Sequence, residues 1–312
     1  MSKRSRESPR RSNLTLPGSN ERFLAKAPSI DADAFILDLE DAVAPGEKVG
    51  ARAKICAAVL ENDFGGRPVT VRINGWTTEW ARDDVATVVA GCKGRLDAVM
   101  VPKASGPEEI RAVSALIDEI ERIEGITLGT TGIDILVESA VGLASVEATV
   151  LASPRIESLS VGLGDLAATL GMPVLVAGEP VAGYPGDIYH YALFRLLVAG
   201  RAAEIAVIDG AYQRVEDLET LEQIARRTRA LGFDGKWAIH PSQVGVLNGI
   251  YAPSPEEIAR AQAVISALDA AIESDQAGAI RDADEMIDEA SRTMAIAVLA
   301  RAARSMPIQG RP

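Results

Sequence analysis

The stretch "FILDLEDAV" (residues 35–43) decides the fold, because an apolar run ends within a few positions in three carboxylates. Its first three residues show no alternation with polar residues, which is typical of a strand that is buried on both faces. Asp38, Glu40 and Asp41 follow at once. The pattern predicts a parallel strand whose carboxyl end opens onto a polar surface.

Short apolar runs of the same kind recur along the whole chain, with segments of helical spacing between them. The eight runs are residues 13–18, 34–41, 69–76, 98–105, 133–140, 158–165, 205–212 and 237–243. The clearest helical segments are residues 46–63, 106–125, 189–204 and 217–233. Eight strands that alternate with helices predict an α/β protein with a (β/α)8 TIM barrel over residues 11–252. A doubly wound open sheet is the alternative, but "GLGDLAATLG" (162–171) lacks the GxGxxG phosphate-loop pattern.

Both ends of the chain fall outside the predicted barrel. Residues 1–10 are basic, and we expect them to form a disordered tail. Residues 253–312 have a helical pattern and form a C-terminal extension, with a stretch of expected flexibility at "ESDQAGAIRDADE" (273–285).

Composition excludes several classes of protein. A net charge of −12 argues against a general nucleic-acid binder, which needs a basic face. No apolar run approaches the roughly 20 residues that span a membrane, and no apolar signal-peptide core follows the basic N-terminus. Cys56 and Cys92 are too few for a disulfide framework or a CxxC metal site. A cytoplasmic protein without a membrane or nucleic-acid partner is therefore expected.

Polar residues follow the apolar runs at their carboxyl ends, which in a barrel converge on one face, where active sites of this fold lie. They are Glu40, Asp41, Arg72, Asn74, Lys103, Glu138, Asp165, Asp209, His240 and Gln243. This convergence explains the acids after "FIL": they are predicted to point into a shared polar mouth, away from an apolar interior.

The residue types at the mouth suggest metal-assisted chemistry. Glu138 and Asp165 come from adjacent strands and offer the hard oxygen ligands that Mg²⁺ prefers. Arg72 offers a planar fork for a substrate carboxylate or carbonyl. A structural interpretation stays open beside this one, in which Arg72 and Glu138 form an ion pair at the rim of the barrel.

Taken in order, several stretches resemble the citrate lyase β-subunit-like, or acyl-CoA ester lyase, group of the HpcH/HpaI aldolase family. They are "RSNLTLPGSN", "DAFILDLEDAVAPGEKVGAR", "VTVRINGWTTEW", "VMVPKA", "LVESAVGLAS", "SVGLGDLAATLG", "AVIDGAY", "GFDGKWAIHPSQV" and "MID", from residue 11 to about residue 290. The last long stretch, with "YPGDIYHYALFRLLVAGRAAE", is most similar to the malyl-CoA and methylmalyl-CoA lyases.

The resemblance implies a Mg²⁺-dependent carbon–carbon lyase. Such an enzyme cleaves a 3-hydroxyacyl-CoA, such as malyl-CoA, methylmalyl-CoA or citramalyl-CoA, into acyl-CoA and glyoxylate or pyruvate. It can also form the same compound by a Claisen-type condensation. The family's metal ligands fall on Glu138 and Asp165, and its keto-acid-binding arginine falls on Arg72. Its paired acids fall on Glu40 and Asp41, which support the water shell of the metal and position the arginine.

The "MID" aspartate of the family falls on Asp288. The resemblance implies that this residue comes from a neighbouring subunit's C-terminal segment, in a homotrimer or hexamer, and acts as acid or base at the acyl-CoA α-carbon. The acids around Asp288 have two interpretations: they raise its pKa by like-charge repulsion, or the family's aspartate aligns elsewhere in this stretch. Thr15 stands where the family often has an aromatic residue.

Other residues have weaker assignments. Arg11, Arg22 and Lys26 are candidates for binding the CoA phosphates, with solvated surface charge as the alternative. His240 is expected to shape its loop, and Asp209 to precede a turn. A Schiff-base role for Lys103 is an alternative that the carboxylate pair makes redundant. Cys56 and Cys92 are expected to be structural.

Rival functions share part of this site. One is a metal-dependent aldolase that acts on free hydroxy-keto acids, without CoA. A second is a citrate lyase β subunit that acts on an acyl-carrier-protein thioester. A third is a thioesterase for the same hydroxyacyl-CoA, and a purely structural barrel is the least favoured.

Overall fold

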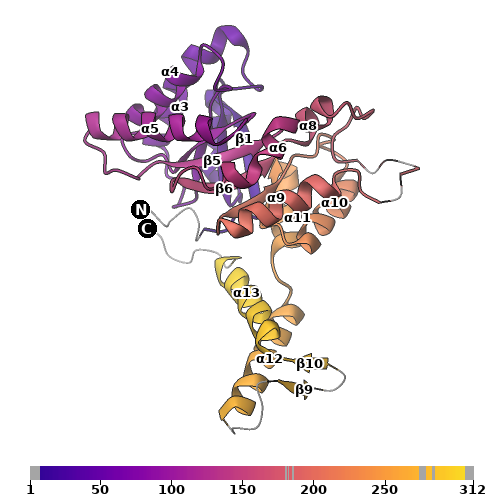
Figure 1. Cartoon of the computed structure of the whole chain (residues 1–312). Coiled ribbons are helices and arrows are strands. Elements are labelled where there is room, and N and C mark those ends of the chain that lie inside the picture. Colours follow the sequence, from indigo (N-terminus) through magenta and orange to yellow (C-terminus); the bar gives the residue numbers. More distant parts are fainter. Residues whose placement is uncertain are drawn as a thin grey trace. The chain divides into compact units, whose positions relative to one another are not determined.

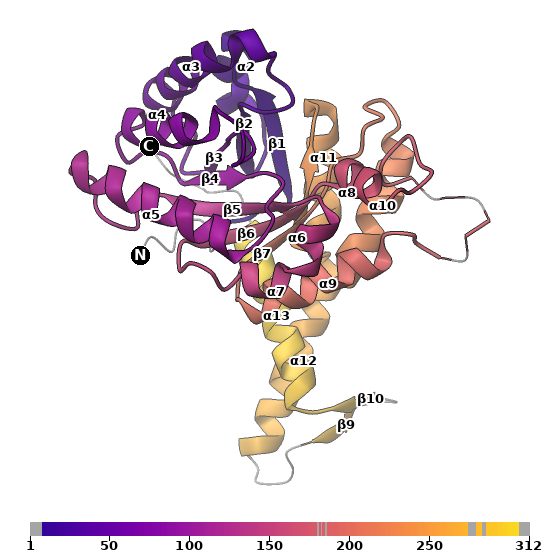
Figure 2. The same cartoon turned by 45° about the horizontal axis from the view of Figure 1, so that its top comes forward.

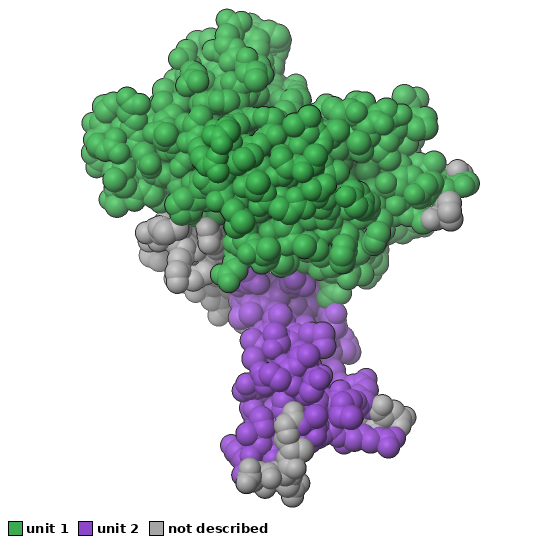
Figure 3. All heavy atoms as spheres, viewed as in Figure 1, with its two compact units in different colours: residues 1–251 green, residues 252–312 purple. Residues whose placement is uncertain are grey.

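The computed structural model describes residues 8–179, 181, 183–184, 186–273, 279–282 and 285–305. The chain divides into two compact units, Met1–Tyr251 and Ala252–Pro312 (Figure 3). Each unit has a hydrophobic core of its own. The division falls one residue before the boundary expected from the sequence.

The first unit is a closed barrel of eight parallel strands in sequential order, which confirms the predicted TIM barrel (Figures 1 and 2). The strands are β1 Ser12–Pro17, β2 Ala34–Asp38, β3 Val69–Arg72, β4 Ala98–Val101, β5 Gly132–Val137, β6 Ile156–Val161, β7 Ala206–Asp209 and β8 Gly235–Ala238. Strand β8 closes the barrel by pairing in parallel with β1. Each strand falls within, or within two residues of, a predicted apolar run, because burial on both faces requires such a run.

Helices follow the strands and cover the outside of the barrel (Figure 2). They are α2 Glu21–Lys26, α3 Lys48–Glu61, α4 Ala81–Gly91, α5 Pro107–Ile123, α6 Ala140–Ala144, α7 Val146–Thr149, α8 Leu163–Thr169, α9 His190–Ala202, α10 Leu218–Leu231 and α11 Pro241–Tyr251, with short 3-10 turns at Ala27–Ser29 and Pro45–Glu47. Helix α5 begins at Pro107 and is followed by Gly125 at φ +65°, as its sequence predicts.

The end of the barrel corrects one predicted boundary. Helix α11 begins at Pro241, inside the run that the sequence assigned to the eighth strand. The strand ends at Ala238, and the helix starts after a short turn. Proline is favourable at this first helical position because the N–H that it lacks would have no partner in the helix. Among the described helices, none has both the length and the apolar character needed to cross a membrane.

The interior of the barrel is apolar in its middle and polar toward both ends. A cluster of Ile36, Met100, Leu136, Ile208 and Trp237 fills its middle. The amino-terminal end instead holds the fully buried Asp134, which corrects the expectation of an apolar interior.

Asp134 is satisfied by three donors. They are Thr70 Oγ1 at 2.8 Å, Ser158 Oγ at 2.6 Å and Arg10 Nη1 at 3.3 Å. Arg10 is only 5% exposed, so this residue of the expected tail belongs to the barrel. Paired in this way, a buried charge is tolerated.

The second unit packs two helices, α12 Pro255–Glu273 and α13 Glu289–Ser305. Between them in sequence lies an antiparallel strand pair, β9 Ile280–Asp282 and β10 Glu285–Ile287. The prediction of a helical extension is therefore correct for most of its length and missed the strand pair. The expected flexible stretch at 273–285 lies in large part outside the described residues.

Candidate active site

The carboxyl ends of β2, β3 and β5 bring the central residues of the site together. Side chains two apart in a strand share a face, so Asp38 follows Ile36, and Glu138 follows Leu136, on the interior side. Ile36 and Leu136 both belong to the interior cluster. Arg72 lies directly beside Asp38 in the register of β2 with β3.

Arg72 is fixed by carboxylates. Its Nε and Nη2 donate to the two oxygens of Asp38 at 2.7 and 2.6 Å, a bidentate pair. Its Nη1 lies 3.1 Å from Glu40 Oε2 and 3.4 Å from Asp41 Oδ2. Burial lowers the pKa of Arg72, but the hydrogen bonds and charge of Asp38, together with the charges of Glu40 and Asp41, raise it overall. Arg72 forms ion pairs with these three acids, which disfavours the alternative of a rim pair with Glu138.

Asp38 is the residue that sequence reasoning undervalued. The resemblance assigned the positioning of the arginine to Glu40 and Asp41, but Asp38 makes the closest contacts. It is fully buried and also accepts from the backbone N–H groups of Glu40 and Ala42, both at 2.9 Å. Strand alternation is the signal that could have found it, since Asp41 lies past the strand with 57% of its side chain exposed.

Glu138 lies buried at the end of β5, with 3% exposure. Its Oε1 accepts from the backbone N–H of Lys103 at 2.8 Å. Burial raises the pKa of Glu138 to about 8, helped by the negative charges of Glu40 and Asp165 and opposed by the Lys103 N–H and by Arg72. A Cβ at Gly162 would lie 2.3 Å from Glu138 Oε2, so only glycine leaves room for this carboxylate.

Asp165 lies in the first turn of α8, half-buried, and its charge acts on Glu138. These two carboxylates could hold Mg²⁺, which commonly takes one or two protein carboxylates and completes its coordination with water and substrate oxygens. Within the described ranges, no group of three or more His, Cys, Asp or Glu side chains is placed to hold a metal by itself. The donor set therefore fits Mg²⁺ and does not fit zinc.

Two lysines hold the loop after β2. Lys103 Nζ donates to Glu40 Oε1 at 2.8 Å. Lys48, which the sequence did not single out, is buried and donates to the backbone oxygens of Leu39 and Glu40 and to Asn74 Oδ1. Burial lowers the pKa of Lys103, but the hydrogen bond and charge of Glu40 outweigh it, and its net pKa is raised. A Schiff-base lysine must lose its proton, so this alternative is disfavoured.

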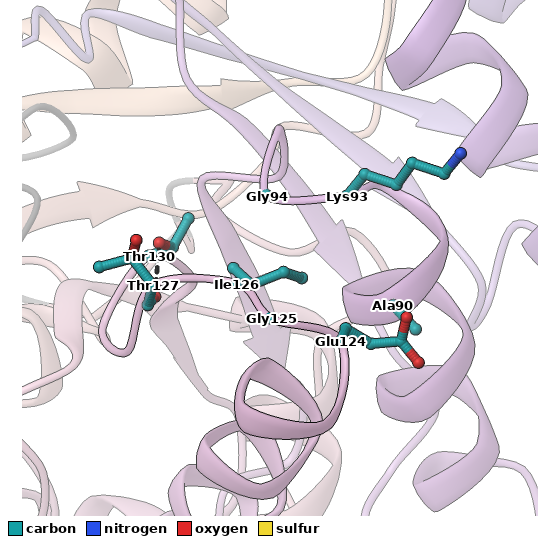
Figure 4. A pocket seen from close by; sticks show the side chains of 8 residues that line it. All are labelled: Ala90, Lys93, Gly94, Glu124, Gly125, Ile126, Thr127 and Thr130. Carbon is teal, nitrogen blue, oxygen red and sulfur yellow. Dashed lines mark hydrogen bonds between the residues drawn. The ribbon is translucent and has the colours of Figure 1, made fainter.

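A cavity of about 440 Å³ opens beside Glu40 and Asp41. Its lining residues are Glu40, Asp41, Lys48, Asn74, Gly75, Trp76, Thr77, Thr78, Trp80, Lys103, Ser105 and Glu109. A second hollow, of about 520 Å³, is lined by the turns that precede β4 and β5 and so lies at the amino-terminal end of the strands (Figure 4). None of the predicted site residues lines the second hollow.

Several predicted residues lie away from the mouth. Arg11 precedes β1, so it lies at the amino-terminal end of the barrel. Its guanidinium binds both oxygens of Asp33, at 2.7 and 2.8 Å, and the prediction that Arg11 binds CoA is therefore wrong. Arg22 and Lys26 are exposed on α2, after the carboxyl end of β1, and remain candidates. His240 is exposed, and its Nδ1 lies 2.8 Å from Ser242 Oγ, as expected for a loop residue.

Asp209 has two partners besides the turn that was expected of it. Its Oδ1 accepts from the N–H of Gly210, but its Oδ2 accepts from Lys236 Nζ at 2.6 Å and from Thr228 Oγ1 at 3.1 Å. Asp209 and Lys236 are both fully buried, toward α10 rather than the mouth. Gln243 is also buried; it accepts from the N–H of Ile239 and donates to a backbone oxygen.

Two further assignments concern residues outside the mouth. Cys56 and Cys92 are buried and free, in agreement with a structural role. Asp288 precedes α13, where its Oδ1 accepts from the N–H of Ser291 at 3.0 Å and from its hydroxyl at 3.1 Å. These bonds lower the pKa of Asp288, so the expectation that neighbouring acids raise it is wrong.

Three known proteins are similar to this chain over most of its length. L-malyl-CoA/β-methylmalyl-CoA lyase from Cereibacter sphaeroides is 36% identical over 272 residues, 84% of this chain and 85% of the relative. A (3S)-malyl-CoA thioesterase from the same species is 36% identical over 276 residues, 88% of each chain. The crystal structure of protein CitE from Mycobacterium tuberculosis in complex with magnesium, acetoacetate and coenzyme A has a TM-score of 0.76 and 28% identity, covering 95% of this chain and 98% of its own.

The sequence profile of one family matches residues 11–241, which include the whole barrel. That range contains the Arg72 fork and the Glu138–Asp165 pair. The chain belongs to the HpcH/HpaI aldolase/citrate lyase family.

Proposed function

We propose that this protein is a Mg²⁺-dependent carbon–carbon lyase of 3-hydroxyacyl-CoA esters. It cleaves a malyl-CoA, methylmalyl-CoA or citramalyl-CoA type of substrate into acyl-CoA and glyoxylate or pyruvate, or runs the reverse condensation. The observation that carries the proposal is the Arg72 fork, fixed by Asp38 beside the Glu138–Asp165 pair. Relatives with malyl-CoA lyase names, at 34–36% identity, support it.

Each residue has a stated role in this proposal. Glu138 and Asp165 hold the metal, which when bound supplies a Lewis acid to the hydroxyl and carboxylate of the substrate. Arg72 orients the keto-acid carboxylate and offsets the negative charge that develops as the C2–C3 bond breaks. Glu40 and Asp41 support this arrangement from the loop after β2.

Asp288 exchanges the proton at the α-carbon of the acyl-CoA. Its lowered pKa keeps it a carboxylate at neutral pH, the form that removes a proton in the condensation direction. We place it in a neighbouring subunit's site, within a homotrimer or hexamer, on the strength of the family resemblance. Two free thiols support a cytoplasmic location.

The test is a coupled assay of acetyl-CoA or propionyl-CoA with glyoxylate or pyruvate, first with Mg²⁺ and then with excess chelator. Metal-dependent formation of a hydroxyacyl-CoA is expected for at least one pair. If folded protein that binds Mg²⁺ forms no product with any of the four pairs, the result would favour a CoA-free aldolase or an enzyme that acts on a carrier-protein thioester.

Thioester hydrolysis is a second candidate, favoured by the thioesterase relative at the same identity. It is separated from the lyase by its products. Hydrolysis releases free CoA in equal amount to the substrate consumed and leaves no keto acid. Cleavage releases a keto acid and leaves the thioester intact.

A further inference from the structure

Lys103 binds two carboxylates of the site with two different atoms. Its backbone N–H donates to Glu138 Oε1 and its Nζ donates to Glu40 Oε1, both at 2.8 Å. The residue has φ +52°, a left-handed conformation that is uncommon for a side chain other than glycine. Such a conformation persists only where its surroundings impose it, and it turns the N–H toward one acid while the side chain reaches the other.

Glu40 is held by a cation on each side. Its Oε1 accepts from Lys103, and its Oε2 lies 3.1 Å from Arg72 Nη1 without forming a hydrogen bond to any described residue. Its side chain is only 7% exposed. Its charge is the second-largest cause of the raised pKa of Glu138. Glu40 and Glu138 are therefore both bound by Lys103, which places a third carboxylate beside one of the two predicted metal ligands.

The position of Glu40 matters because Mg²⁺ has a limited number of coordination sites. Mg²⁺ is near-octahedral and has to accept two substrate oxygens in addition to its protein ligands. A third protein carboxylate would occupy one more position and bind the metal more tightly, at the expense of substrate. We propose that Lys103 is a positioning residue that keeps Glu40 out of the inner coordination sphere of the metal.

This inference rests on the proposed function, because it takes Glu138 and Asp165 as the ligands. It goes beyond it by giving Lys103 a role in metal affinity with a defined sign. Loss of the lysine charge should tighten metal binding and weaken substrate binding. A lysine that only supported the fold would weaken both.

The experiment uses the full-length protein and Lys103→Met, with Lys103→Arg as the charge-preserving control. Calorimetric titration without substrate should show about tenfold tighter Mg²⁺ binding in Lys103→Met and an unchanged constant in Lys103→Arg. Water-proton relaxation with Mn²⁺ as the probe should show about one fewer exchanging water on the metal. Glyoxylate should bind the metal-loaded Lys103→Met about tenfold more weakly. If Lys103→Met folds poorly, Lys103→Gln takes its place with the same expectations.

The double variant Lys103→Met/Glu40→Gln tests whether Glu40 is the added ligand. It should lose the extra affinity and regain the water count of the unmodified protein. Mg²⁺ binding in Lys103→Met that is unchanged or weaker overturns the inference. Two other results would overturn the proposed function itself. One is an unmodified protein that binds no Mg²⁺, and the other is a Glu138→Gln variant that binds Mg²⁺ normally.

Discussion

Arg72 and Asp38 form a buried, bidentate ion pair between neighbouring strands, with N–O distances of 2.7 and 2.6 Å. The two residues stand opposite each other in the β2–β3 register, so the pair is built by the barrel itself rather than by a loop. A site on rigid elements holds its groups in a narrower range of geometries than a site on loops. The arginine that is proposed to bind substrate is therefore in position before substrate arrives.

Replacing Asp38 by asparagine should cost both activity and stability. The buried guanidinium would keep its charge but lose its closest counter-ion. We expect a loss of about 10²–10³ in kcat/KM and roughly 3 kcal/mol in the free energy of unfolding. Steady-state kinetics and urea unfolding measure the two effects. Asp41→Asn is the matched control: Asp41 is half-exposed and 3.4 Å away, so a change within about threefold is expected. A larger loss from Asp41→Asn than from Asp38→Asn would contradict this ranking.

Metal binding should depend on pH through Glu138. Its pKa in the metal-free protein is raised to about 8, so below that pH a proton competes with the metal. The Mg²⁺ association constant should rise by about tenfold per pH unit up to pH 8 and then level off. Calorimetry between pH 6 and 9 tests this, and the slope of the association constant against pH is expected to change at about pH 8. A break near the ordinary value for glutamate would mean that burial does not control this group.

The same pKa has a consequence for stability. A folded pKa above the unfolded value favours the folded state below the unfolded pKa, and this contribution is lost as pH rises toward 8. Glu138→Gln should therefore stabilise the metal-free protein at pH 8, by roughly 2–4 kcal/mol, and have little effect near pH 4. Thermal unfolding at both pH values measures the difference. A variant that is destabilised at pH 8 would show that Glu138 is not strained by its burial.

Gly162→Ala should damage the metal site while the barrel stays folded. The added Cβ would meet Glu138 Oε2 at 2.3 Å, so the carboxylate must move. We expect Mg²⁺ affinity to fall by at least about tenfold. Gly164→Ala, two residues further on in α8, is the control. Its Cβ would come no closer than 3.8 Å to a neighbouring atom outside the backbone of its own helix, so the substitution should leave the affinity unchanged. Equal affinities in both variants would mean that Glu138 has room to reposition.

The barrel could be predicted from the sequence because each of its eight strands is buried on both faces and so produces a short apolar run. Strand ends were less certain, as Pro241 shows, since an apolar run does not reveal where a strand gives way to a helix. The β9–β10 pair was missed because two three-residue strands among charged residues carry almost no periodicity.

For the site, residue type and position at strand ends identified Arg72, Glu138 and Asp165 as a group. What failed was the direction of single side chains. Asp209 stands at the end of its strand like the others, but its carboxylate pairs with Lys236 outside the mouth. Arg11 precedes its strand and so lies at the wrong end of the barrel to meet a ligand at the mouth. Such facts depend on partners that are distant in sequence.

The role of Asp288 can be separated from its contacts at the start of α13. Asparagine also accepts hydrogen bonds as a helix cap, so Asp288→Asn should keep the stability of the second unit but lose the acid–base group. Asp288→Ala should lose both, at a cost of about 1 kcal/mol in unfolding free energy. If the residue acts in a neighbouring subunit, mixing Asp288→Asn chains with Arg72→Ala chains restores activity, because some sites then combine an intact barrel with an intact Asp288. An active Asp288→Asn variant would instead show that Asp288 serves as a helix cap and not as the acid–base group.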